Sequence, residues 1–448
     1  MATRPALDRG RIAGFCAYDF ADSAFATTIL AVLFNQYFAG QVAGGAQGVE
    51  LFGLRLPGAT VWAWLVALSM SIVVALGPFL GALADRRRGR IAALALFWLP
   101  GVVATFLLRT VDPGEWVSGG LLFLCAFVCY SAASIFYNSL LPEIAPAERR
   151  GRISGLAWGI GYVGGALLLV VNLVMLRRPD LLGAPAGAFD LRDCFASAGL
   201  WWFLFALPLF FAFTRPRAGA VALLPRATAS FWADAVASIR EVRATGRALL
   251  RQRNLRTFFL AYLLYNDGVQ TIVSLASVFG AQELGMKPEQ LILLFLAIQA
   301  TAFIGSLVLG QIADRRGHRG MLLVCVVAFT LVSFWAAGIG IFGNALREYW
   351  ILCSIAGLFL GGIQSGSRSW VTHWIPEGRE AEYFGFFSIM TRVAAIFGPL
   401  VFGGLLLATG SMRASILAVA LFFVAGGSLL LRVRSDAVAA ERAALSRA

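Results

Sequence analysis

The sequence predicts an all-α integral membrane protein in which twelve transmembrane helices form two pseudo-symmetric six-helix bundles. Composition supports this prediction, because the chain of 448 residues is 59% hydrophobic and only 14% charged. A soluble protein of this length needs more charge to cover its surface. A repeat supports the pseudo-symmetry: Gly81–Arg90 reads GALADRRRGR and Gly310–Arg319 reads GQIADRRGHR. An element repeated at this distance predicts a duplicated six-helix unit.

Apolar stretches define the predicted helices. About 20 residues cross ~30 Å of hydrocarbon, and each stretch reaches or approaches that length. The stretches are 12–38, 60–83, 91–110, 117–141, 153–176, 196–214, 256–280, 289–313, 320–343, 349–375, 382–408 and 414–431. A polar interruption then divides the chain into a first bundle (1–214), a cytoplasmic linker (215–255) and a second bundle with a short tail (256–448). The linker has helical periodicity, which predicts an amphipathic helix at the membrane surface.

The placement of arginine predicts the orientation of the chain. The net charge is +13, and arginines cluster in the short loops 86–90, 149–152 and 315–319. These loops lie on one side of the predicted bundle, so the positive-inside rule places both termini in the cytoplasm. The first apolar stretch is too long for a signal peptide and is expected to remain as a helix. We therefore expect a multi-pass protein of the cell inner membrane that contacts lipid and no nucleic acid.

Residue types for metal or covalent chemistry are sparse. The chain has two histidines and six cysteines. Cys125 and Cys129 share a helical face without a histidine beside them, which favours packing over metal binding. No nucleophile–base pair is evident. The sequence thus predicts no enzyme, no metal site and no cofactor, and we expect a monomer.

Glycine patterns predict close helix packing. The fifth helix carries a GxxxG pair, Gly155 and Gly159, followed by Gly161, Gly164 and Gly165, and the tenth helix carries two such pairs between Gly357 and Gly366. Small residues at this spacing let helix backbones approach each other. In the second and eleventh helices, Gly77-Pro78 and Gly398-Pro399 predict local bending.

Five ionisable residues fall inside predicted helices: Asp19, Asp22, Asp267, Arg368 and Arg392. At 1.5 Å per residue they lie about 12–16 Å from the cytoplasmic helix ends, near the middle of a ~30 Å core. Charges at this depth cost at least ~2.5 kcal/mol, so they normally pair or line a watery cavity. Two alternatives remain open at this point: a functional charge layer, or a structural ion-pair network.

The balance of charge among these five residues predicts a role for the acids and another for the arginines. Three acids face two arginines, so one of Asp19, Asp22 and Asp267 lacks a basic partner and could bind a proton reversibly. Arg368 and Arg392 suit a carboxylate or another anionic group of a small-molecule substrate. Polar side chains expected beside them are Tyr18, Asn138, Asn266, Gln270 and Gln364.

The repeated loops predict a gate at the cytoplasmic surface. Asp85 and Asp314 end the second and eighth helices next to arginines, where they could contact neighbouring helix ends and break those contacts in another conformation. The Leu-Pro-Glu and Ile-Pro-Glu sequences that close the fourth and tenth helices supply possible partners. The predicted gate residues are Gly81, Asp85, Arg86, Glu143, Gly310, Asp314, Arg315 and Glu377.

These motifs resemble a known family. The repeated loop is similar to the signature of the major facilitator superfamily, and its second copy (Gly310, Asp314, Arg315, Gly317) keeps the usual spacing, whereas the first has an extra arginine before Gly89. Three stretches resemble the UMF1 branch, which includes vacuolar amino-acid effluxers linked to autophagy: YDFADSAFATTI (18–29), FYNSLLPE with RGRISGLAWGIGYVGG (136–165), and GGIQSGSRSW with IPEGREAEYFGFFSI (361–389).

The resemblance implies two bundles around a central cavity that work by alternating access. Members of the branch usually read Asp-Trp-Ala-Asn-Ser in the first helix, where this chain has Asp19-Phe20-Ala21-Asp22-Ser23, so Asp22 adds a titratable group. They usually carry a lysine where Arg392 stands, so a cation is kept. Amino-acid export is suggested by these relatives.

The expected function is therefore a secondary transporter of a small polar or anionic solute, such as an amino acid or a related metabolite, driven by protons. Two alternatives stay open: a multidrug or xenobiotic exporter of the same fold, in which the first-helix acids bind a cation, and a membrane sensor or scaffold without transport. Substrate, direction and stoichiometry do not follow from the sequence.

Overall fold

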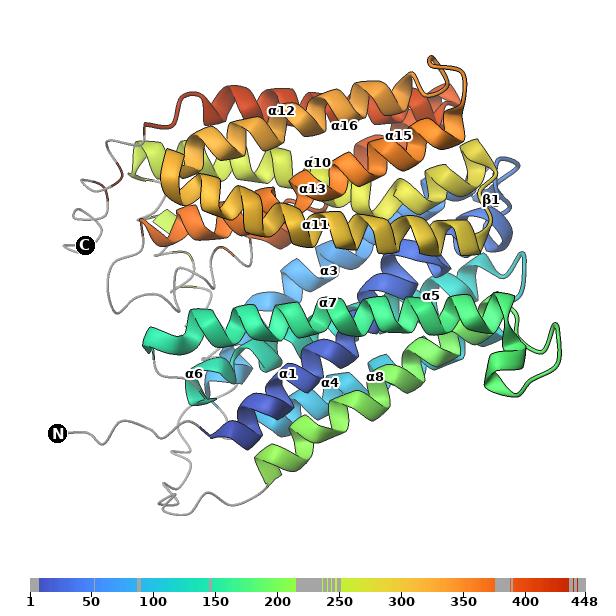
Figure 1. The fold of residues 1–448 in the computed structure, drawn as a ribbon, viewed down its shortest axis with the longest axis horizontal. Coiled ribbons are helices and arrows are strands. Elements are labelled where there is room, and N and C mark those ends of the chain that lie inside the picture. The colour runs from blue at the N-terminus through green and yellow to red at the C-terminus, as the bar shows by residue number, and fades with distance from the viewer. Residues whose placement is uncertain are drawn as a thin grey trace. The chain divides into compact units, whose positions relative to one another are not determined.

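The computed structural model describes residues 8–51, 53–86, 90–144, 147–214, 251–374 and 390–434, with positions 236, 240, 243, 246–247, 387, 438 and 441. Most of these residues are helical (Figure 1). The long helices are α1 (Arg9–Ala24), α3 (Gly58–Arg86), α4 (Arg90–Leu107), α5 (Trp116–Asn138), α7 (Ala147–Arg177), α8 (Leu191–Thr214), α10 (Arg253–Leu284), α11 (Pro288–Arg316), α12 (His318–Ala337), α13 (Ala345–Thr372), α15 (Phe397–Thr409) and α16 (Met412–Leu430).

Short elements continue or connect these helices. α1 is extended by η1 (Phe25–Val32), α2 (Phe34–Tyr37) and η2 (Phe38–Val42), of which η1 and η2 are π-helical. The others are η3 (Leu108–Thr110), α6 (Leu141–Ile144) and η4 (Pro179–Leu182), and an antiparallel hairpin of β1 (Val49–Leu51) and β2 (Leu54–Leu56). The sequence reasoning had not predicted this hairpin.

Eleven of the twelve predicted stretches fall on one long helix each, the first with its π-helical continuation. In the described chain, eleven segments are long and apolar enough to cross a membrane. The remaining long helix is α10, whose 32 residues include the buried polar side chains Asn254, Asn266 and Asp267. The eleventh stretch is broken: helical residues 390–393 are followed by a turn and then by α15. The all-α prediction is confirmed, while most of the predicted linker helix lies outside the described residues.

Contacts group the chain into two compact units. Unit 1 comprises Met1–Phe38 and Ala75–Ile239, and unit 2 comprises Ala39–Val74 and Arg240–Ala448. In chain order, residues 39–74 belong to the first half. By contacts they group with unit 2, so that α3 contributes its first part to unit 2 and its last part to unit 1.

In unit 1, α1 packs between α7 and α8. The prediction for the glycines of α7 is confirmed in part: a Cβ atom at Gly164 would lie 2.2 Å from the carbonyl oxygen of Phe20, whereas one at Gly159, a member of the predicted GxxxG pair, would meet nothing within 4 Å. Gly161 is similarly close to Asp19, at 3.2 Å from its carbonyl oxygen. Small residues therefore bring α7 against the turn of α1 that carries the two acids.

In unit 2, glycines likewise join α11 to α13. A Cβ atom at Gly305 would lie 1.8 Å from the carbonyl oxygen of Leu358, and one at Gly361 would lie 2.0 Å from that of Ala302. Side chains at these positions would force the two helices apart. The prediction that the tenth-helix glycines serve close packing is confirmed.

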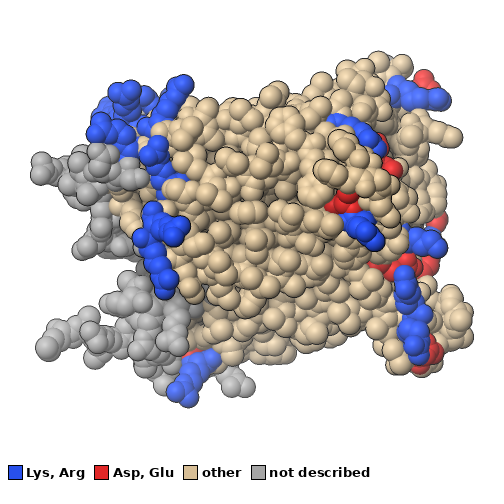
Figure 2. Space-filling view, turned by 45° about the horizontal axis from the view of Figure 1, so that its top comes forward, with Lys and Arg blue, Asp and Glu red and all other residues tan. Residues whose placement is uncertain are grey.

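Charge divides between the two ends of the helices. In unit 1 we call the helix end at Arg90 the inner end and that at Thr110 the outer end. In unit 2 the helix ends at Arg253 and Arg316 are the inner ends, and that at Leu284 is the outer end. Figure 2 shows charged side chains gathered at the ends and an uncharged surface between them. An uncharged band between charged ends is the surface that a bilayer requires.

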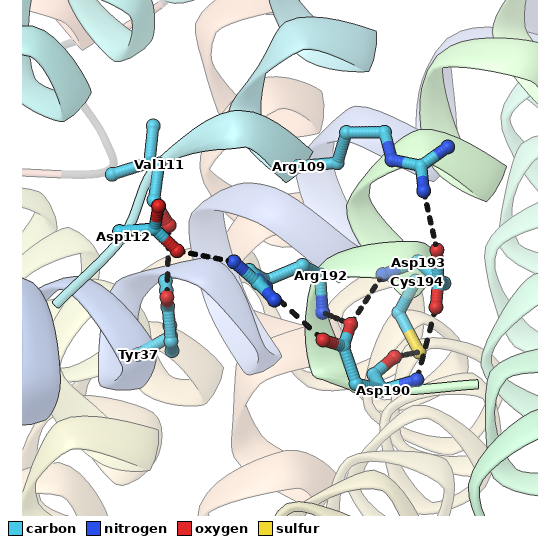
Figure 3. Close-up of polar contacts among 8 residues, drawn as sticks. All are labelled: Tyr37, Arg109, Val111, Asp112, Asp190, Arg192, Asp193 and Cys194. Carbon is cyan, nitrogen blue, oxygen red and sulfur yellow. Dashed lines mark hydrogen bonds and ion pairs between the residues drawn. The ribbon is translucent and has the colours of Figure 1, made fainter. Parts of the chain in front are cut away.

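Ion pairs fasten the outer end of unit 1 (Figure 3). Arg192, in the first turn of α8, contacts Asp112 and lies 3.0 Å from Asp190. Arg109 of η3 pairs with Asp193 at 3.2 Å. Partial burial of Asp190 works against its charged form, yet hydrogen bonds from Arg192 and from backbone N–H groups outweigh burial and lower the pKa of this carboxyl. We call Arg109, Asp112, Asp190, Arg192 and Asp193 the outer ion-pair cluster.

Candidate functional site

The first helix brings two acids to one turn. Asp19 and Asp22 are three residues apart on α1, so their side chains project from neighbouring positions of the helix. Asp22 is 8% exposed. Directly after it, at Phe25, the helix changes to the π-helical segment η1, and π-helical turns are frequent at functional sites.

The Asp22 carboxylate stands apart from basic groups. Among the described residues it has no ion pair and no hydrogen bond, and the charged side chain that acts on it is Asp19. Two carboxylates this close repel each other when both are ionised. Of the three predicted acids, Asp22 is the one whose carboxylate has neither an ion pair nor a hydrogen bond among the described residues.

Aromatic side chains lie beside the turn of α1 that carries Asp19 and Asp22. The Tyr18 ring is fully buried and stacks on Tyr137 of α5, with ring centroids 4.7 Å apart. Tyr137 stacks in turn on Phe15 at 4.2 Å and donates a hydrogen bond from its hydroxyl to the Phe15 carbonyl oxygen at 2.9 Å. Asn138, the next residue, is exposed and donates to Ser134 on its own helix.

Asp267 occupies a very different environment in unit 2. It is 2% exposed, and both of its carboxylate oxygens lie 2.8 Å from the backbone nitrogen of Gly398. Gly398 is in the first turn of α15, whose N-terminal N–H groups lack partners within the helix. The carboxylate thus caps α15 and meets the positive end of its helix dipole.

The local sequence explains this junction. A Cβ atom at Gly398 would lie 1.9 Å from the Thr271 hydroxyl oxygen and 2.8 Å from Asp267, so no larger residue fits. Pro399 follows in the first turn of α15, where a missing N–H leaves no helix bond unmade. The bend predicted from Gly398-Pro399 is confirmed as a turn at residues 394–396 directly before α15.

Two tyrosines of α10 extend the polar layer of unit 2. Tyr262 shares a hydrogen bond of 2.8 Å with Thr391, on the helical turn that also carries Arg392. Tyr265 shares one of 2.7 Å with Ser367, the residue before Arg368 on α13. Because of these bonds, α10 is tied directly to both segments that bear the predicted arginines.

The other predicted binding residues are placed as follows. Arg392 is half-buried directly before the turn, and Asn266 is 5% exposed, with an amide nitrogen that has no hydrogen-bond partner among the described residues. Gln270 and Gln364 are half-buried on α10 and α13. The backbone of Arg368 lies in α13, and its side chain is outside the described part.

The gate prediction falls largely outside the described side chains. Asp85 and Arg86 end α3 and Asp314 lies in the last turn of α11, as expected, and Glu143 lies in α6. The side chains of Asp85, Arg86, Glu143 and Asp314 and the surroundings of Gly81 are not described, and Glu377 lies outside the described residues altogether. Gly310 is half-buried and Arg315 is exposed. The gate stays a prediction.

An outer latch within unit 2 was missed by sequence reasoning. Three side chains near the start of α3 donate hydrogen bonds to backbone carbonyl oxygens: Trp62 to Ser274 of α10 at 3.2 Å, Thr60 to Gly403 at 3.1 Å, and Trp64 to Leu400 at 3.4 Å. Gly403 and Leu400 both belong to α15. We call Thr60, Trp62 and Trp64 the outer latch. Its sequence signal is the pair of tryptophans at alternate positions, which the apolar pattern hides.

Comparisons with known proteins agree with this architecture. A model of the family described as Vacuole effluxer Atg22 like matches residues 8–443. The uncharacterized MFS-type transporter YxiO of Bacillus subtilis is 25% identical over 432 residues, which cover 94% of each chain. Autophagy-related protein 22-1 of Penicillium rubens is 24% identical over 475 residues, covering 88% of this chain and 79% of the relative.

Solved structures show the same fold. The nucleoside transporter NupG aligns with a TM-score of 0.66 and 15% identity over 94% of this chain and 98% of its own. The xylose transporter XylE from E. coli, in an inward open conformation, aligns with a TM-score of 0.64 and 15% identity over 97% of this chain and 98% of its own. At this identity the likeness concerns the fold, which is that of the major facilitator transporters.

Proposed function

Because the chain belongs to the Vacuole effluxer Atg22 like family of multi-pass membrane transporters, we propose that it exports a small polar or anionic solute by proton-coupled alternating access. The observation that carries this proposal is the Asp22 carboxylate, which is buried and has no basic partner among the described residues. A buried acid without a partner is the group most able to alternate between a protonated and an ionised form.

The proposed coupling uses the repulsion between Asp19 and Asp22. When both acids are ionised in a site of low dielectric, each raises the energy of the other. Binding of one proton removes that repulsion and lets α1 adopt a different arrangement. A proton bound on one side of the membrane and released on the other then drives the cycle.

The proposed substrate site lies on the polar layer of unit 2. Arg392 supplies a guanidinium that can hold a carboxylate through two hydrogen bonds, and Arg368 is proposed as a second cation. The Asn266 amide nitrogen, a buried donor without a partner among the described residues, is available to a polar substrate atom. These donors favour an anionic or zwitterionic solute, of which amino acids are the first class to test.

The outer latch supports alternating access. Its three hydrogen bonds hold the first part of α3 against α10 and α15, although the last part of α3 groups with unit 1. A helix shared between two units must break one set of contacts when the units rearrange. We propose that the outer latch opens in the outward-facing state, while the gate around Asp85 and Asp314 closes.

One observation favours a second candidate function. The aromatic rings of Tyr18 and Tyr137 stand next to an acid without a basic partner among the described residues, a combination that also suits a lipophilic cation. In that case Asp22 would bind the substrate directly, and the protein would export xenobiotic cations. The solute that moves distinguishes the two candidates.

Reconstituted liposomes test the proposal. Purified protein would be offered labelled amino acids, other small anions and lipophilic cations, with and without a pH gradient across the membrane. We expect gradient-driven movement of a polar or anionic solute and a loss of that movement in Arg392→Ala. Glu283→Gln is the control, because Glu283 lies at the outer end of α10, where it pairs with Arg413 at 3.6 Å, away from the proposed site.

Each alternative has its own outcome in this experiment. Movement of lipophilic cations with no movement of anions would favour the second candidate. An absence of flux across the whole panel would instead favour a sensor or scaffold. Antibody access to tags at each terminus of intact cells tests the proposed cytoplasmic position of both termini in the cell membrane.

A further inference from the structure

The end of the chain returns to the helices that carry the proposed substrate site. Arg319 of α12 donates hydrogen bonds to the carbonyl oxygens of Leu430 and Leu431, where α16 ends. The backbone N–H of Arg434 then donates to the Asn254 side chain at 3.2 Å, and Val438 is 8% exposed. The described part of the tail is therefore fastened to the inner end of unit 2.

Glu441 makes the decisive contacts of this tail. Its two carboxylate oxygens accept hydrogen bonds from the backbone N–H groups of Asn254 at 2.9 Å and Leu255 at 3.2 Å. Both groups lie in the first turn of α10, where N–H groups have no partner within the helix. The residue at the N-cap of α10, Gln252, contributes no side-chain bond. A carboxylate from 187 residues away thus takes the capping position.

The same carboxylate reaches α13 through a tryptophan. The indole N–H of Trp374, just after α13, donates to Glu441 at 3.3 Å. The Trp374 ring stacks on Phe258 of α10 with centroids 5.2 Å apart and contacts Trp370 of α13 at 5.1 Å. One side chain of the tail therefore touches the inner ends of two helices whose rings already pack against each other.

We propose that Glu441 is a positioning residue for transport, which clamps the inner ends of α10 and α13 together and so fixes the substrate-binding layer between them. This inference rests on the proposed function. Tyr265 joins Ser367 seven residues along α10 from Phe258, and Arg368 follows Ser367. A helix is stiff over two turns. Holding the inner ends of α10 and α13 together therefore also holds Tyr265 and Ser367 in position to form this hydrogen bond.

Hydrogen exchange tests the clamp itself. In Glu441→Ala, the amides of Asn254 and Leu255 should exchange at least about tenfold faster, as expected from the loss of a charge-assisted hydrogen bond. Glu441→Gln keeps one acceptor oxygen and should show an intermediate rate. Glu283→Ala, at the other end of the same helix, is the matched control and should leave both amides unchanged. Unchanged exchange at both amides in Glu441→Ala would overturn the clamp.

Transport kinetics test the positioning role. In Glu441→Ala liposomes, we expect the KM for the solute to rise at least about fivefold, the low end of coupling between separate sites. Glu441→Gln should recover most of the affinity. A purely structural role would lower the amount of folded protein and leave KM unchanged, so faster exchange with an unchanged KM would overturn the positioning role. Failure of the proposed function would appear differently, as absence of flux in the wild-type protein.

Discussion

Asp22 in unit 1 and Asp267 in unit 2 hold similar places in the two halves of the sequence and have opposite surroundings. Asp267 accepts the single backbone N–H of Gly398, which is shared between its two carboxylate oxygens, and caps a helix. Asp22 has no such donor among the described residues, and its charged neighbour is another acid. One carboxylate thus has a backbone donor at a helix end, whereas the other has none among the described residues.

The difference shows that the sequence duplication places a buried acid in each half, and that tertiary packing determines what each acid contacts. The turn at 394–396 exposes helix N–H groups to Asp267, and α1 offers no break of that kind beside Asp22. We therefore propose that Asp22 moves the proton and that Asp267 holds the bent eleventh helix. The outer ends of the units differ as well: several ion pairs fasten unit 1, whereas unit 2 has the neutral hydrogen bonds of the outer latch and the pair Arg413–Glu283.

The strongest test of the comparison exchanges the acids for amides. Asp22→Asn should reduce gradient-driven flux to background, because an amide cannot carry the proton. Exchange of labelled for unlabelled solute at equal pH should continue, since that reaction needs no net proton movement. Solute accumulation driven by a pH gradient in Asp22→Asn liposomes would contradict the proposed difference in role between the two acids.

Gly398→Ala should produce the next largest effect, and mainly on stability. The added methyl group would lie 1.9 Å from the Thr271 hydroxyl, so the start of α15 must move. Overpacking of this kind typically costs about 1–3 kcal/mol. Thermal unfolding in detergent measures it, with Gly404→Ala as the control, because a Cβ atom there meets nothing within 4 Å. Equal melting temperatures for the two variants would contradict the tight junction.

Asp267→Asn should be milder than Gly398→Ala. The amide keeps one oxygen acceptor for the Gly398 N–H but loses the charge that the helix end favours. We expect a loss of about 1–2 kcal/mol in stability, with gradient-driven transport retained in part. If this variant instead behaved like Asp22→Asn, with exchange intact and driven flux absent, Asp267 would be the proton carrier.

The outer latch of unit 2 offers a smaller effect. Trp62→Phe removes the indole donor to Ser274 and keeps an aromatic ring. Loss of about 1 kcal/mol should shift the population toward latch opening by about fivefold. Spin labels at the exposed positions Leu54 and Thr409 would report this as a larger fraction of long distances. An unaltered distance distribution would show that the latch does not hold α3.

The outer ion-pair cluster of unit 1 should matter least. Arg192→Ala removes two partly exposed pairs that solvent screens, so we expect a loss of only about 0.5–1 kcal/mol, which declines further in high salt. Because the pKa of folded Asp190 is lowered, its contribution is complete above the unfolded pKa of about 3.9 and is lost as pH falls below that value. Melting curves from pH 3 to pH 7 would check this: the stability difference between wild type and Arg192→Ala should shrink as the pH falls, whereas the difference between wild type and Trp62→Phe should stay constant.

Sequence periodicity predicted the fold well and the contacts of the candidate site only in part. Apolar length and the repeated loops were sufficient for twelve helices, because crossing a bilayer imposes a length and forbids unpaired backbone groups. The glycines of α13, and Gly161 and Gly164 of α7, were correctly interpreted as packing residues, whereas a Cβ atom at Gly159 meets nothing within 4 Å. The N–H group of Gly398 was missed as a partner of Asp267, because every residue has a backbone and no pattern marks which helix will break beside an acid.

The sequence by itself determined the class of protein, its helices and the identity of the buried charges. Tertiary structure decided which acid is satisfied, which tryptophans close the outer end of unit 2, and that Glu441 returns to cap α10. The physical reason is that hydrophobic length is a local property of the chain, readable residue by residue. Hydrogen bonds to Asp267, Ser274 and Asn254 instead join residues more than 130 positions apart, and only packing brings such groups into contact.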